Sequence, residues 1–128
     1  MSFSQRLNRW IEGSQREVFE LNKSITLRLM KGVLKDTPVL EGRLRSNWFP
    51  TKGAPSNETS EQIVDLNVKI AEIDNFIKST IKPDEDFDVY LTNNLPYAYG
   101  IEYEKYSEIK APRGMVRINL FNIAEKLR

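Results

Sequence analysis

The chain has 128 residues, of which 40% are hydrophobic and 29% are charged. This length suits a single domain, residues 1–128, and the apolar fraction is large enough to form a core. Its 19 basic and 18 acidic residues leave a net charge of +1, so the chain lacks the excess positive charge of a general polyanion binder.

Cysteine and histidine are both absent from the chain. Their absence excludes disulfides, thiolate catalysis, thiolate and imidazole metal ligation, and a Ser-His-Asp triad. Carboxylates, lysines and tyrosines remain as possible catalytic groups. However, no pair of carboxylates can be assigned to a shared pocket, and the six glycines form no phosphate-binding loop. We therefore expect no enzyme, no cofactor and no metal site, and a carboxylate hydrolase is the least favoured class.

Polar and charged residues interrupt every apolar stretch of the chain, including the segment that follows residues 1–6. No secretory signal is expected from this pattern, and no run approaches the roughly 20 apolar residues that a membrane span needs. The pattern predicts a soluble protein made in the cytoplasm, without a membrane partner.

The first predicted element is a long amphipathic helix from Phe3 to Lys35. Ser2 and Gln5 have the spacing of a capping box, and Pro38 disfavours helical geometry at the residue before it. Apolar residues recur at the three- and four-residue steps that line one face of a helix. They are Phe3, Leu7, Ile11, Val18, Leu21, Ile25, Leu29 and Val33.

Beyond this helix, Gly42 suggests a turn, and residues 43–51 fit a short strand near a sheet edge because Pro50 cannot donate a backbone hydrogen bond. Residues 51–57 have the composition of a loop. Thr59 and Gln62 then form a second candidate capping box. The helix predicted after it ends at Lys82-Pro83 and carries Ile63, Leu66, Ile70, Ile73, Ile77 and Ile81, with Val64, Val68 and Phe76 widening its apolar face.

Residues 87–92 alternate in polarity as a half-buried strand does, residues 93–96 form a turn, and residues 115–127 fit a final helix. The predicted order is helix, strand, helix, strand or strands, helix. This order predicts an α+β fold in which a small antiparallel or mixed sheet packs against a second long helix and a C-terminal helix.

Two charged clusters are candidate sites. Asp84, Glu85, Asp86 and Asp88 resemble the start of a calcium loop, but Val89 and Leu95 stand where that loop needs glycine and glutamate, so a solvated turn is the better interpretation. The second cluster is basic and offers either a phosphate-binding face or an ordinary solvated helix face. It comprises Arg28, Lys31, Lys35, Arg43 and Arg45.

All five tyrosines fall between Tyr90 and Tyr106. Tyrosine combines a large apolar ring with a polar tip and suits surfaces that become buried on association. The sequence therefore leaves two interpretations open, with an interface slightly favoured over packing of the sheet against the helices. Trp10 and Trp48 are interpreted as core anchors.

Two segments of the chain resemble tailed-phage neck and tail-completion proteins, the family that includes lambda minor tail protein Z. Residues 37–48, Thr-Pro-Val-Leu-Glu-Gly-Arg-Leu-Arg-Ser-Asn-Trp, resemble the first family segment. Asn-Asn-Leu-Pro-Tyr-Ala at 93–98, Ile-Glu-Tyr at 101–103 and Ala-Pro-Arg-Gly-Met-Val-Arg at 111–117 resemble the second. The candidate motif and interface residues are Thr37, Pro38, Gly42, Arg43, Trp48, Asn93, Pro96, Tyr97, Glu102, Tyr103, Pro112 and Met115.

The resemblance implies a virion structural role at the head–tail joint, without catalysis, with synthesis in the host cytoplasm. It implies contacts with other neck and tail-tube proteins and with further copies of the chain in a ring, a hexamer by analogy, with DNA only passing nearby. The chain departs from the family pattern at Leu40-Glu41, which replaces Asp-Thr. It departs again at Glu104, where the family has glycine. The alternative function is a small nucleic-acid-binding or regulatory module that uses the basic stretch Arg28–Arg45.

Overall fold

The computed structural model describes residues 2–39, 42–83, 85, 88–104 and 113–127. Its elements confirm the predicted α+β fold with a long N-terminal helix, an antiparallel sheet, a second long helix and a C-terminal helix. In chain order they are α1 (Phe3–Asp36), α2 (Arg43–Ser46), β1 (Trp48–Lys52), α3 (Leu66–Thr80), β2 (Val89–Asn93), α4 (Ala98–Tyr103) and α5 (Val116–Lys126).

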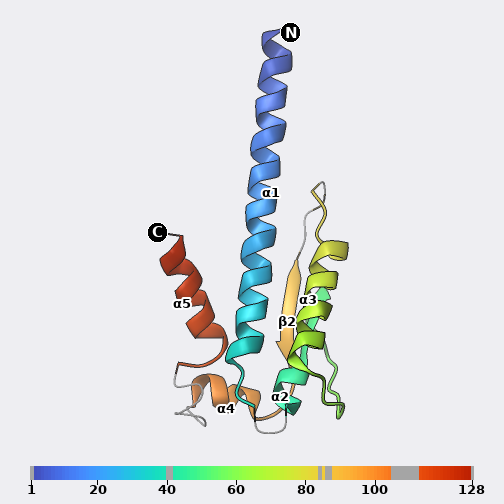
Figure 1. The fold of residues 1–128 in the computed structure, drawn as a ribbon, viewed down its shortest axis with the longest axis vertical. Coiled ribbons are helices and arrows are strands. Elements are labelled where there is room, and N and C mark those ends of the chain that lie inside the picture. Colours follow the sequence, from blue (N-terminus) through green and yellow to red (C-terminus); the bar gives the residue numbers. More distant parts are fainter. Residues whose placement is uncertain (1, 40–41, 84, 86–87, 105–112, 128) are drawn as a thin grey trace.

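Helix α1 is the axis around which the other elements are arranged (Figure 1). It packs against α3 on one side and against α5 on the other, and α2 and α4 lie near its C-terminal end. We call this part of the molecule the base: elements α2 to α5, the sheet and the C-terminal part of α1. The N-terminal part of α1 extends well beyond the base (Figure 1).

The sequence predicts both ends of α1 within one residue. The capping box is formed, since the Gln5 backbone N–H donates to Ser2 Oγ at 3.2 Å and the Ser2 backbone N–H donates to Gln5 Oε1 at 2.9 Å. At the other end Thr37 leaves the helical conformation, and its hydroxyl donates to the Val33 carbonyl oxygen at 2.6 Å. The helix is unbroken between these caps.

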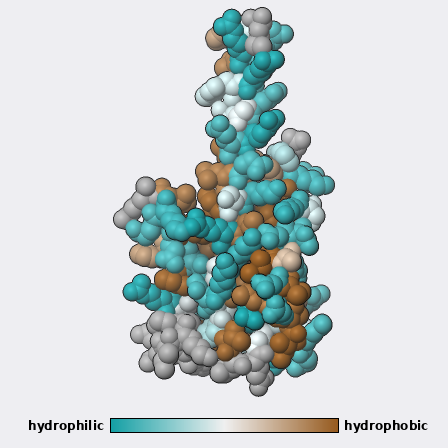
Figure 2. Space-filling model, in the orientation of Figure 1, coloured by the Kyte–Doolittle hydropathy of each residue, from teal (hydrophilic) through white to brown (hydrophobic). Residues whose placement is uncertain are grey.

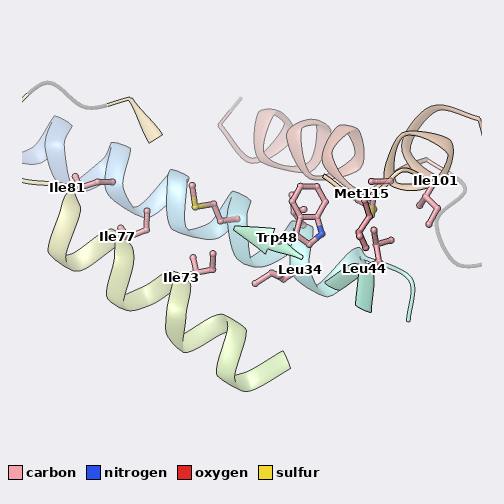
Figure 3. Close-up of a cluster of buried hydrophobic side chains, with 12 residues drawn as sticks. Leu34, Leu44, Trp48, Ile73, Ile77, Ile81, Ile101 and Met115 are labelled. Carbon is pink, nitrogen blue, oxygen red and sulfur yellow. The ribbon is translucent and has the colours of Figure 1, made fainter. Parts of the chain in front are cut away.

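The hydrophobic core fills the base between α1, α3, the sheet and the short helices (Figure 3). Ile73 and Ile77 are almost completely buried on the side of α3 that faces α1, where the sequence predicts an apolar face. The core consists of Met30, Val33, Leu34, Leu44, Trp48, Ile73, Ile77, Ile81, Leu95, Ala98, Ile101 and Met115. Ile63 and Val68 are 57% exposed and lie outside this core, contrary to the predicted apolar face.

Strands β1 and β2 pair in an antiparallel sheet, with Trp48 opposite Asn93 and Lys52 opposite Val89. This register holds the two motif segments side by side, because residues 37–48 lead into β1 and residues 93–98 lead out of β2. The predicted strand 87–92 is present as 89–93, and Phe87 lies outside the described residues.

The predicted strand over residues 43–51 was wrong at its start, because Arg43–Ser46 form the short helix α2. Gly42 takes the left-handed conformation at φ 87° and begins this turn. Ser46 Oγ donates to the Gly42 carbonyl oxygen at 2.7 Å, and Asn47 Nδ2 donates to the Arg43 carbonyl oxygen at 2.7 Å. These side-chain bonds close a helical turn that strand propensity alone does not anticipate.

The predicted capping box at Thr59 and Gln62 was also wrong, because α3 begins at Leu66 with Asp65 as its cap. The backbone before α3 is bound by side chains of the α2 turn instead. The Ser60 N–H donates to Asn47 Oδ1 at 2.8 Å, and the Val64 N–H donates to Ser46 Oγ at 2.8 Å. Tertiary hydrogen bonds therefore replace the first helical turn that the sequence predicts.

The C-terminal helix was predicted correctly and spans Val116–Lys126. Helix α4, Ala98–Tyr103, was not predicted. It is too short to show a helical repeat of apolar residues, and its tyrosines are not strong helix formers.

Candidate assembly surfaces

The part of α1 outside the base carries an exposed row of large apolar side chains, which we call the α1 stripe. It consists of Phe3, Leu7, Trp10, Ile11, Val18 and Leu21. Phe3 is 78% exposed, Trp10 69% and Val18 58%. The interpretation of Trp10 as a core anchor was therefore wrong, whereas Trp48 is buried as predicted.

Apart from Trp10, the α1 stripe is the N-terminal part of the predicted apolar repeat, and the fold does not cover it. The buried residues of α1 are Met30, Val33 and Leu34, all in its last two turns. Most helical stability in proteins comes from packing of the apolar face against other elements. Large exposed apolar patches mark interaction sites on soluble proteins. In the view of Figure 2 most of the projecting helix is hydrophilic, with apolar side chains at its edge.

A second exposed group of apolar side chains lies at the base, on and beside α4. We call it the tyrosine surface: Tyr97, Tyr99 and Tyr103, which are 38%, 63% and 56% exposed. The rings of Tyr99 and Tyr103 lie 4.9 Å apart, and the Arg117 guanidinium stands 5.0 Å from the centre of the Tyr103 ring. Pro96 is exposed beside this surface, and Tyr106 lies outside the described residues.

The first motif segment is largely buried. Trp48 Nε1 donates to Thr37 Oγ1 at 2.9 Å, so the indole and the hydroxyl satisfy each other in the core. Pro38 is half-buried, and Gly42 is buried beside the Ile63 side chain. Arg43 pairs with Glu61 at 2.7 Å. Leu40-Glu41, the departure from the family pattern, lies outside the described residues. The described positions of this segment thus join α1 to the sheet.

The second motif segment contacts the first through Asn93 and contacts the start of α5 through Glu102. Asn93 Nδ2 donates to the Leu44 carbonyl oxygen at 2.8 Å, which ties the end of β2 to α2. Met115 is buried in the core, and Glu104, the second departure from the family pattern, ends α4 with φ −108°. This is ordinary backbone geometry that glutamate adopts without strain. Pro112 lies outside the described residues.

Glu102 is a buried carboxylate at the N-terminus of α5. It accepts hydrogen bonds from the backbone N–H groups of Met115, of Val116 at 3.0 Å and of Arg117 at 2.9 Å. Arg117 also donates to it through Nε at 3.2 Å and donates to the Glu102 carbonyl oxygen. Gly114, at φ 81°, leaves the room that this carboxylate needs, because a Cβ there would come 2.7 Å from it. Glu102 thus caps α5 from α4.

Two opposing effects act on the pKa of Glu102. Burial by itself raises the pKa, but the backbone N–H groups of Met115, Arg117 and Val116 and the Arg117 side chain stabilise the charged form and lower it below its ordinary value. The carboxylate is therefore ionised near neutral pH and satisfies N–H groups that the start of a helix leaves unpaired. Such a group is a structural clamp and has no proton to donate to a reaction.

Three basic residues of α1 line a groove of about 410 Å³ between α1 and α5. Arg28, Lys31 and Lys35 come from α1, and Lys126 and Asn122 from α5. Lys31 pairs with Asp74 at 2.9 Å. Arg43, the next member of the predicted basic cluster, pairs with Glu61 away from this groove. The basic stretch Arg28–Arg45 is therefore not one surface, and only its first part forms a cationic groove.

The acidic cluster forms no described metal site. Asp84 and Asp86 lie outside the described residues, and Glu85 is 3.5 Å from Lys52 in an ion pair. Within residues 2–39, 42–83, 85, 88–104 and 113–127, no three acidic residues are grouped as metal ligands. Over the same ranges, no helix combines the length and apolarity needed to cross a membrane.

Comparison with known proteins gives no match to this chain among protein-family models, curated proteins or solved structures. The geometry of the chain's own surfaces therefore carries the functional argument. The apolar repeat in the sequence indicates every residue of the α1 stripe except Trp10, but it does not show that the fold leaves them exposed.

Proposed function

We propose that the chain is a structural protein of a tailed-phage particle that acts at the head–tail joint, as a tail-completion, tail-terminator or neck protein. It works by ring-forming protein–protein contacts, with copies of itself and with neck and tail-tube proteins, and without catalysis. The motif resemblance supports the phage assignment. The observation that carries an assembly role is the α1 stripe, which stays exposed along a helix that projects from an otherwise packed base.

The tyrosine surface supports a ring contact. Closed rings use heterologous contacts, in which two different patches of one subunit meet. The tyrosine surface lies at the base and the α1 stripe on the projecting helix, so one chain offers two separate apolar patches. Aromatic side chains with polar tips are enriched in such interfaces, and Arg117 beside Tyr103 adds a cation of the kind found there.

The test is electron microscopy and light scattering of the purified protein, alone and mixed with phage heads and tail tubes. We expect rings or binding to tube ends once heads or tail tubes are present. The variant Tyr97→Ala/Tyr103→Ala should lose ring formation, whereas Phe121→Ala, which removes an exposed aromatic ring from α5, should keep it. Circular dichroism checks that both variants stay folded. Unchanged assembly of the tyrosine variant would reject this surface as the ring contact, and a wild-type chain that binds neither phage heads nor tail tubes would reject the proposed function.

The cationic groove between α1 and α5 favours nucleic-acid binding as the second candidate function. Binding there should weaken steeply as salt rises and should fall in the variant Lys35→Glu/Lys126→Glu. Assembly through apolar surfaces should change little with salt. Binding of labelled DNA, measured by fluorescence anisotropy between 50 and 300 mM salt, separates the two functions.

A further inference from the structure

We propose that the α1 stripe of the free protein pairs with the α1 stripe of a second copy, in antiparallel orientation. This inference rests on the proposed function, because it names the partner of the same surface before particle components are present. The stripe spans residues 3–21, about 28 Å of helix at 1.5 Å per residue. Its apolar side chains are available to a partner along this whole length.

The apolar repeat of α1 is self-complementary when two copies run in opposite directions. Leu7, Ile11, Val18 and Leu21 follow the alternating three- and four-residue steps of a two-helix seam, with Ser14 filling the step between Ile11 and Val18. With the twofold axis between residues 12 and 13, Leu7 of one copy faces Val18 of the other. In the same register, Ile11 faces the small Ser14, so a large side chain meets a small one.

The charges of the projecting helix favour this orientation. Residues 3–11 carry Arg6 and Arg9 and no acid, a net charge of +2, and residues 12–21 carry three glutamates and Arg16, a net charge of −2. Antiparallel pairing sets each basic half against an acidic half, whereas parallel pairing in register sets like charges together. Electrostatic complementarity of this kind selects orientation.

One ion pair follows from the register. At 3.6 residues per turn, Arg6, Trp10 and Glu17 lie on the same edge of the stripe, and the other edge carries the uncharged Ser4, Asn8 and Gln15. Antiparallel helices join like edges. Arg6 of one copy therefore comes beside Glu17 of the other, within about two residues along the axis, and the contact occurs twice.

The shape of the molecule accommodates the same orientation. Helices α3 and α5 flank α1 at the base, and Phe19 is the first residue of α1 that packs against the core. An antiparallel overlap of residues 3–21 keeps the two bases at opposite ends of the pair. A parallel overlap in register would bring both bases to the same end of the pair, on either side of the joined helices (Figure 1).

Sedimentation of the full chain between about 1 and 200 µM tests whether copies pair. We expect dimers of the wild-type chain, and the variant Leu7→Ser/Val18→Ser should weaken association by about 100-fold, because four large side chains per dimer lose their burial. The matched control Asn8→Ser/Gln15→Ser removes the same number of side chains outside the apolar seam and should dimerise as the wild type does. A wild-type chain that stays monomeric at 200 µM would overturn the proposal.

Charge reversal tests the register. Arg6→Glu alone and Glu17→Arg alone should each weaken the dimer by about tenfold, because each sets like charges side by side. The double variant Arg6→Glu/Glu17→Arg should restore wild-type association. A double variant that is weaker than either single variant would refute the Arg6–Glu17 contact and with it this register.

Oxidative cross-linking tests the orientation, since the chain has no cysteine of its own. A mixture of Leu7→Cys and Val18→Cys chains should form a mixed disulfide dimer, identified by its mass, while neither variant should link to itself. Self-linking of Leu7→Cys would indicate a parallel pair and reject the proposal.

Failure of this inference is distinguishable from failure of the proposed function. If the wild type is monomeric and Leu7→Ser/Val18→Ser abolishes binding to tail tubes, another neck protein covers the stripe and only the inference fails. If the wild type forms the antiparallel dimer but binds no phage component, the inference stands and the proposed function fails.

Discussion

Asn119 of α5 lies directly against Gly32 of α1, so closely that a Cβ at position 32 would come 2.0 Å from Asn119 Oδ1. The side chain of Asn119 is fixed from both helices: Nδ2 donates to Asp36 Oδ2 at 2.8 Å and to the Met115 carbonyl oxygen at 2.6 Å. It cannot turn aside without breaking these bonds. Gly32 therefore sets how closely α5 approaches α1 at the base.

We predict that Gly32→Ala lowers the free energy of unfolding by about 1–3 kcal/mol, because either α5 moves away or Asn119 gives up its hydrogen bonds. Alanine is the better helix former, so a purely local effect would raise stability instead. Urea denaturation followed by circular dichroism distinguishes the two signs. In the double variant Gly32→Ala/Asn119→Ala the added methyl group no longer meets the Asn119 amide, and the two effects should be less than additive.

Glu102→Gln should lower the free energy of unfolding at neutral pH by about 2–4 kcal/mol, because the amide offers only one acceptor to N–H groups that the carboxylate now satisfies. The loss should appear first as weaker hydrogen-exchange protection at the start of α5. The matched control is Glu104→Gln, because Glu104 is exposed at the C-terminal end of α4. This variant should leave the free energy of unfolding unchanged.

The pH dependence of stability follows from the lowered pKa of Glu102. Because the pKa is lower in the folded chain than in the unfolded one, the carboxylate stabilises the fold above the ordinary glutamate pKa of about 4.3. That contribution is lost as pH falls through the folded-state pKa. The stability difference between wild type and Glu102→Gln should therefore be constant between pH 6 and 8 and should shrink below about pH 4.3. A difference that stays constant down to pH 2 would contradict the clamp.

Thr37→Val should lower the free energy of unfolding by about 1–3 kcal/mol, because it leaves the Trp48 indole N–H buried without its acceptor. Trp48→Phe removes the donor and also leaves a cavity, and should cost about 2–4 kcal/mol. Chemical denaturation in a Trp10→Phe background isolates the fluorescence of Trp48, which should be blue-shifted in the folded chain because the indole is buried. Additive costs in the double variant would argue against a direct contact between the two side chains.

Removal of residues 2–17 should leave the free energy of unfolding of the base within about 0.5 kcal/mol of the wild type, because the core begins at Phe19 on α1. The same deletion removes most of the α1 stripe and should abolish self-association. Thermal unfolding and sedimentation of the shortened chain measure the two effects separately. A base that fails to fold without these residues would show that the projecting helix stabilises it.

Much of this protein could be predicted from its sequence, because the signals involved are local. The capping box at Ser2 and Gln5, the proline after Thr37 and the apolar repeats fixed the three long helices and the α+β class, since caps and helical periodicity act within a few residues. The turn at Gly42 followed from a similarly local signal.

Contacts between distant segments decided what the sequence could not. The start of α3 depends on Asn47 and Ser46, which bind the backbone of residues 60–64 from elsewhere in the chain. Glu102 caps α5 because the fold places its carboxylate, which comes from α4, beside the first turn of α5. The buried residues of α1 are Met30, Val33 and Leu34, and only Val33 of these belongs to the predicted apolar repeat. Periodicity specifies which face of a helix is apolar, whereas burial of that face depends on where the other elements pack.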